Sequence, residues 1–146
     1  MNLLLDTHIW LWSLLEPERL APAVASALTA DTARRWLSPI SVWEAHLLIE
    51  RGRLRVDAPA AEWVRDALAK APIDEAPLTT EVALASRAVK TKHRDPADRF
   101  LVATAQVFDL TLVTADRALY DMPGVRVLTN LPRRQRRPGQ VKAPAR

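Results

Sequence analysis

Short apolar runs alternate along the chain with longer stretches in which apolar residues recur at helical spacing. The run Leu3-Leu4-Leu5 is continuous and apolar, which is typical of a strand buried on both faces. Residues 7–15 then have the pattern of a largely buried helix. The same reasoning predicts further strands at 35–38, 73–77, 111–114 and 125–128, and further helices at 22–30, 41–51, 59–71, 80–89, 96–108 and 116–120. This alternation indicates an α/β fold in which a parallel sheet has helices on both faces.

Capping residues predict where several of these helices begin and end. Ser41, with Glu44 three residues later, has the pattern of a capping box, and Gly52 is placed to end the same helix. Thr80 is expected to cap the helix at 80–89, and Pro96 suits the first turn of the next helix.

Four acidic residues stand at the edges of apolar segments: Asp6, Glu44, Asp98 and Asp116. Asp6 and Asp116 follow two predicted strands, whereas Glu44 and Asp98 lie in the first turns of two helices that follow connections on the same side. Because ligands of such sheets bind beyond the carboxyl ends of the strands, all four side chains can project to one edge. Taken alone, each acid is adequately explained as a helix cap or a first-turn acid.

Four carboxylates at one place need a positive partner. Ionised carboxylates are costly to bury unless something neutralises them, and like charges repel one another. The chain has no cysteine, and His8, His46 and His93 are not at ligand spacing, so the donors are oxygens, which suit Mg²⁺ or Mn²⁺. One or two such ions can activate water and stabilise the charge of an in-line attack on a phosphodiester.

Composition narrows the class of protein. The chain has 146 residues, 49% of them hydrophobic and none of them cysteine, which fits one domain and excludes disulfides, thiolate zinc sites and a cysteine nucleophile. The N-terminus lacks the basic region of a signal peptide, and no apolar run approaches the ~20 residues that span a bilayer. We therefore expect a soluble, cytoplasmic protein with no membrane partner.

The basic character of the chain, with an isoelectric point of about 10.1, is concentrated in its last residues. Residues 132–146 contain six Lys or Arg and no acid, so the net charge of +4 for the whole chain leaves −2 for residues 1–131. Three prolines and a glycine argue against regular structure there. We predict a folded domain at 1–131 and a flexible basic tail at 132–146, which is either an electrostatic arm for nucleic acid or a solvated terminus.

Four segments carry a family resemblance: residues 4–8 (LLDTH), 38–44 (SPISVWE), 93–103 (HRDPADRFLVA) and 112–116 (LVTAD). In this order and at these spacings they resemble the PIN-domain family, and more closely its ribonucleases of the VapC toxin type. The resemblance covers residues 1 to about 131 and implies a small three-layer α/β/α sandwich with a mainly parallel sheet. It also implies RNA cleavage that depends on Mg²⁺ or Mn²⁺, a homodimer, and an antitoxin whose C-terminal segment lies over the active site.

Carried over position by position, the resemblance assigns catalysis and metal binding to Asp6, Glu44, Asp98 and Asp116. Asp95 is the open point. It is expected to cap the helix that follows it, but some family members carry an acid there, so it could instead bind metal through water.

Three further residues are candidate supporting residues. The hydroxyls of Thr7 and Thr114 stand beside acids and could bind a carboxylate or a metal-bound water, or they could be ordinary strand-end threonines. Arg99 could hold a substrate phosphate or lie on the solvent face of its helix. The five tryptophans are expected to be core or interface residues, since they lie in apolar periodic segments.

Two other functions compete with a ribonuclease. A metal-dependent phosphatase or phosphoryl-accepting domain also places an Asp after the first strand. Phosphatases of the haloacid-dehalogenase type need a second Asp where this chain has His8, and receiver domains need paired acids near the first strand. A non-catalytic PIN-like binding module is disfavoured because clustering like charges brings no evident stability.

Overall fold

A parallel sheet forms the centre of the computed structural model, which describes residues 1–92 and 95–131. The predicted basic tail at 132–146 lies outside the described residues. The sheet has five strands in the order β3-β2-β1-β4-β5, and every neighbouring pair is parallel. The strands are β1 (Asn2–Leu5), β2 (Arg34–Leu37), β3 (Asp74–Glu75), β4 (Thr111–Thr114) and β5 (Val127–Thr129).

The three leucines of β1 are buried on both faces of the sheet, as their continuous apolar pattern predicts. They are 0%, 0% and 2% exposed. Because successive side chains of a strand point to opposite faces, Leu3 and Leu5 join one hydrophobic cluster and Leu4 joins the other. β1 lies between β2 and β4, with Leu4 opposite Trp36 on one side and Leu112 on the other.

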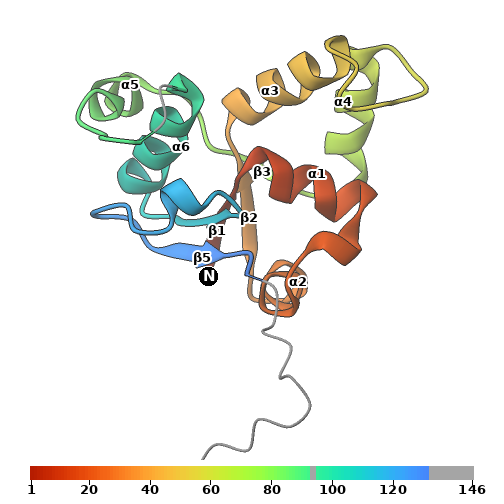
Figure 1. Ribbon diagram of the computed structural model, residues 1–146. Helices are drawn as coiled ribbons and strands as arrows, with labels where there is room; N and C mark the ends of the chain where they lie inside the picture. Colours follow the sequence, from red (N-terminus) through yellow and green to blue (C-terminus); the bar gives the residue numbers. More distant parts are fainter. Residues whose placement is uncertain (93–94, 132–146) are drawn as a thin grey trace, which may run out of the picture.

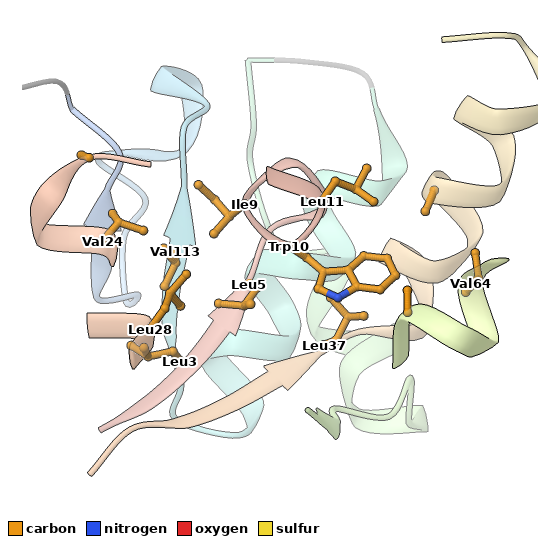
Figure 2. Close-up of a cluster of buried hydrophobic side chains, with 13 residues drawn as sticks. Leu3, Leu5, Ile9, Trp10, Leu11, Val24, Leu28, Leu37, Val64 and Val113 are labelled. Atoms are coloured by element: carbon orange, nitrogen blue, oxygen red, sulfur yellow. The ribbon is translucent and has the colours of Figure 1, made fainter. Parts of the chain in front are cut away.

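Helices cover both faces, so the predicted three-layer α/β/α architecture is confirmed (Figure 1). On one face lie α1 (Thr7–Leu15), α2 (Pro22–Thr29), α3 (Pro39–Glu50) and α4 (Ala60–Lys70). Figure 2 shows the cluster that these helices form against the sheet, with Trp10 between the strands and the helical layer. The other face is covered by α5 (Thr80–Ser86) and α6 (Pro96–Val107). Single turns of 3₁₀ helix, η1 (Pro17–Arg19) and η2 (Arg117–Leu119), complete the connections.

Two predicted helix caps are wrong. The Ile40 backbone N–H donates to Ser38 Oγ at 3.1 Å, so Ser38 is the cap, three residues before the predicted cap Ser41, and α3 begins at Pro39. Ser41 is instead fully buried inside the first turn of α3, and Glu44 lies in its second turn. Similarly, Thr79 rather than Thr80 caps α5, because Thr79 Oγ1 accepts from the Val82 N–H at 3.2 Å.

Other boundaries differ by a few residues. The α-helical part of α5 ends at Ser86, because the N–H groups from Arg87 to Val89 bond three residues back, in the tighter 3₁₀ pattern. The predicted strand at 73–77 shortens to two residues between prolines, which cannot donate to a ladder. Gly52 follows α3 with a φ of +69°, which confirms the predicted helix end. None of the described helices is long and apolar enough to cross a membrane.

Candidate active site

The carboxyl ends of β1 and β4 bring Asp6 and Thr114 side by side. The two strands are neighbours in the sheet, and the Asp6 N–H continues their ladder by donating to the Val113 carbonyl at 2.9 Å. The Thr114 hydroxyl then donates to Asp6 Oδ2 at 2.6 Å. Residues 108 positions apart thus share one hydrogen bond at the edge of the sheet.

Asp6 is both a helix cap and a member of an acidic cluster. Its Oδ1 accepts from the Thr7 N–H at 2.7 Å, which begins α1 as the cap interpretation predicts. Burial raises the pKa of Asp6, and the nearby charge of Asp116 raises it further, while the two hydrogen bonds and His8 act against this. The cap therefore positions a carboxylate that is poorly solvated.

Glu44 reaches the same place from α3. The Thr7 hydroxyl donates to Glu44 Oε1 at 2.9 Å and lies 3.0 Å from Ser41 Oγ. A hydroxyl carries one hydrogen, so Ser41 completes the chain by donating to Thr7. Burial raises the pKa of Glu44 to about 7, and repulsion from Asp6 and Asp95 adds to the effect.

Asp98 approaches from the first turn of α6. Asp95 begins this helix, because its Oδ1 accepts from the Ala97 N–H at 3.0 Å, so the cap expected at Asp95 is present. Burial raises the pKa of Asp98 to about 7, and the charges that raise it further come from Asp95, Asp6, Asp116 and Glu44, in decreasing order. The charges of these four acids therefore all act on Asp98 and disfavour its ionised form.

Asp116 follows β4 and caps η2. Its Oδ1 accepts from the Ala118 N–H at 3.0 Å, and its own N–H donates to Thr114 Oγ1 at 3.0 Å. Thr114 therefore binds two of the acids at once, since it also donates to Asp6. The two predicted threonines are buried and hydrogen-bond to the acids: Thr7 holds Glu44, and Thr114 holds Asp6 and Asp116.

The acids converge on one pocket of about 800 Å³. Its lining comprises the four predicted acids with Asp95, and also His8, Trp12, Arg19 and Ala115. Arg99 is not part of this lining. It lines a separate pocket of about 300 Å³ with Arg87 and Phe100, and its buried Nε has no hydrogen-bond partner among the described residues.

The donor set fits a hard divalent cation in chemistry, but the side chains are not yet arranged around one. Among the described residues, no group of three or more Asp, Glu or His side chains is positioned to hold a metal ion. Both oxygens of Asp6 accept hydrogen bonds from the protein, and three of the acids have a raised pKa. Such a group of carboxylates is stabilised by a cation, which would draw their oxygens together.

Sequence reasoning missed several residues of the pocket. Ser41 was expected to be a cap, and its role in holding Thr7 depends on a contact across 34 residues. His8, Trp12 and Arg19 were not expected in the site. The spacing of His8 and Trp12 could have predicted their place in the pocket. They are four residues apart, so they lie on the same face of the helix that Asp6 caps.

The sequence and fold match known proteins over most of the chain. Residues 3–125 match the PIN domain family. Ribonuclease VapC22 of Mycobacterium tuberculosis (strain ATCC 25618 / H37Rv) is 34% identical over 120 residues, which cover 81% of this chain and 89% of that protein.

Solved structures share the fold at low sequence identity. VapBC2 from Rickettsia felis, bound to a DNA fragment from its promoter, aligns with a TM-score of 0.66 at 14% identity, over 88% of this chain and 98% of that one. A toxin–antitoxin complex from Klebsiella pneumoniae aligns with a TM-score of 0.64 at 22% identity, over 88% and 98% of the two chains. The family match, the VapC22 relative and the shared fold agree: this chain belongs to the PIN-domain family.

Proposed function

We propose that this protein is an endoribonuclease that hydrolyses RNA phosphodiester bonds with Mg²⁺ or Mn²⁺ and acts as the toxin of a toxin–antitoxin pair. The observation that carries the proposal is the convergence of Asp6, Glu44, Asp98 and Asp116 on one open pocket. The name of the 34% identical relative, Ribonuclease VapC22, supports RNA as the substrate.

Asp6, Glu44, Asp98 and Asp116 are the residues that would hold the metal. A bound divalent cation would supply charge neutralisation and activation of the attacking water. The protein contributes position: Thr7 holds Glu44, Thr114 holds Asp6 and Asp116, and the Asp95 cap fixes the first turn of α6 and hence Asp98. In this proposal Asp95 is a positioning residue and not a metal ligand.

The cluster must be neutralised before RNA enters, because four carboxylates in one pocket repel phosphate. This requirement gives the proposal a direct test. Purified protein should cleave RNA with Mg²⁺ or Mn²⁺, EDTA should stop cleavage, and Asp6→Asn should abolish it. Asp31→Asn, which changes an exposed acid outside the pocket, should remain active.

The competing functions give different results in the same assays. Cleavage that persists in folded Asp6→Asn protein contradicts the proposed site. A covalent aspartyl-phosphate would indicate the phosphoryl-accepting alternative. Calorimetry that detects no binding of Mg²⁺ or Mn²⁺ would favour the non-catalytic binding module.

The proposed partners are a cognate antitoxin and a second copy of the chain. Several solved structures with this fold are toxin–antitoxin complexes, which supports the antitoxin. Exposed apolar side chains support protein contacts: Trp43 is 56% exposed and Leu84 is 65% exposed. Co-expression with a cognate antitoxin should suppress toxicity, and sedimentation should show the mass of a dimer.

A further inference from the structure

The pocket contains a second group of side chains beside its acids. His8, Trp12 and Arg19 share its lining with the carboxylates. His8 and Trp12 come from α1, and Arg19 is the last residue of η1. The catalytic chemistry proposed above uses none of the three.

Arg19 is held over the face of Trp12. Its guanidinium carbon is 4.3 Å from the centroid of the Trp12 ring, within the range of a cation–π contact. Arg19 Nη1 also donates to Glu16 Oε2 at 3.1 Å, in an ion pair that is about half exposed. The His8 ring lies 5.8 Å from the Trp12 ring at an angle of 57°. These contacts restrict a long side chain that would otherwise sample many rotamers.

The charge of Arg19 matters because of what surrounds it. Among the described residues that line the pocket, it is the one side chain that is always positively charged, and five of its neighbours in the lining are acids. An RNA strand that places one phosphate at the acids must place the adjacent nucleotides along the same pocket. A fixed arginine offers those nucleotides a cation for a phosphate and a plane for a base.

We propose that Arg19, backed by Trp12, binds the nucleotide beside the scissile phosphate through both its phosphate and its base. The inference rests on the proposed function, since it assumes that RNA occupies the pocket. Guanidinium N–H groups donate to the phosphate of the flanking nucleotide, and the guanidinium plane stacks on its base. A base within a duplex is already stacked on both faces, whereas an unpaired base has a face to offer.

The chain contains a matched control for this arrangement. Arg34 stands 4.5 Å from the centroid of the Trp36 ring and donates to Asp74 Oδ2 at 2.7 Å. Its side chain is 62% exposed, compared with 54% for Arg19. Arg34 begins β2, at the end of the sheet opposite the carboxyl ends of the strands. Arg34→Gln therefore removes an equivalent arginine–tryptophan contact away from the pocket.

The test measures RNA affinity without turnover. Proteins that all carry Asp98→Asn are titrated with a fluorescein-labelled 12-nucleotide RNA in Mn²⁺, and binding is followed by anisotropy at several salt concentrations. Arg19→Gln should weaken binding about tenfold and lower the salt dependence by about one phosphate contact. Arg19→Lys should keep the salt dependence but lose affinity, because a lysine provides charge without a plane. Arg34→Gln should bind like the parent, and a duplex of the same RNA should bind more weakly than the single strand.

Each other result contradicts a defined part of the inference. If Arg19→Gln and Arg34→Gln bind equally well, the inference is wrong while the proposed function stands. If Arg19→Lys binds like the parent, Arg19 is a point charge and the stacking role is wrong. If the parent binds no RNA and the unmodified protein cleaves none, the proposed function fails and the inference fails with it.

Discussion

Replacing Asp98 by asparagine should stabilise the metal-free fold at alkaline pH while it abolishes activity. The reason is that Asp98 is ionised at pH 8 in a half-buried site among other acids. Burial raises the pKa of Asp98 from its ordinary 3.8 to about 7, and four neighbouring acids add repulsion. Asparagine has nearly the same shape and no charge, so it relieves the repulsion in the folded state.

The sign and size of the effect follow from proton linkage. Between about pH 4 and pH 7 the folded state binds the Asp98 proton more tightly than the unfolded chain does, so stability falls as pH rises through this window. Of this window, the assay between pH 5 and pH 8 covers the part from pH 5 to the folded-state pKa of about 7, which is about two pH units. The loss of unfolding free energy over that part is therefore at most ~3 kcal/mol. Because Asp98 is only half-buried, solvent screening reduces this to about 1 kcal/mol.

Urea denaturation in EDTA gives the unfolding free energy of the wild type and of Asp98→Asn at pH 5 and at pH 8. The effect is the difference between the two proteins in the stability lost between these pH values. The wild type should lose more stability than Asp98→Asn between the two pH values, by about 1 kcal/mol. At pH 5 the Asp98 carboxyl is protonated, so the favourable interaction of its charge with the helix dipole is present only at pH 8, where it opposes the destabilisation by burial and repulsion. Asp31→Asn, at an exposed turn outside the pocket, should follow the wild type.

Equal pH dependence of the wild type and Asp98→Asn would refute the reasoning. It would mean that neither burial nor repulsion from the neighbouring acids disfavours the charge of Asp98 in the folded protein. Addition of Mn²⁺ at pH 8 provides an internal check, because it should stabilise the wild type more than Asp98→Asn.

Three further predictions follow from the same contacts. Calorimetry in buffers of different ionisation enthalpy should show that Mn²⁺ binds more tightly at pH 8 than at pH 6 and releases protons at pH 6, because Glu44 and Asp98, each with a pKa of about 7, must be ionised to bind it. Thr7→Val should lower kcat/KM about 10- to 100-fold with little change in far-UV circular dichroism, since Glu44 loses its donor. Leu112→Ala should cost about 2–5 kcal/mol of unfolding free energy in urea, because this side chain is fully buried.

The helix boundaries show where local patterns become ambiguous. Two serines near the start of α3 each have acceptable capping chemistry in the sequence: Ser38 stands before a proline, and Ser41 stands three residues before an acid. The folded chain uses Ser38 as the cap because Ser41 is buried against Thr7 from α1. A contact between residues far apart in sequence decided between two local alternatives of similar energy.

Arg19 and Arg99 show that local sequence patterns are also a limited guide to which residues line the pocket. Arg99 directly follows a predicted acid, yet it lines another pocket, because adjacent residues in a helix point in directions about 100° apart. Arg19 is 13 residues from Asp6 and enters the site because η1 turns the chain back over Trp12. Proximity in sequence was therefore a poor guide to membership of the pocket.

The sequence by itself determined the parallel sheet, the burial of β1 on both faces and the placement of acids where strands end or helices begin. These features depend on side-chain periodicity and on the direction of the chain, which are local properties. Only the tertiary structure decided that the acids share one pocket, that the pKa of Glu44 and of Asp98 rises to about 7, and that Arg19 and Trp12 join them. Burial and charge repulsion depend on distances through space, and those distances exist only once the helices have packed on the sheet.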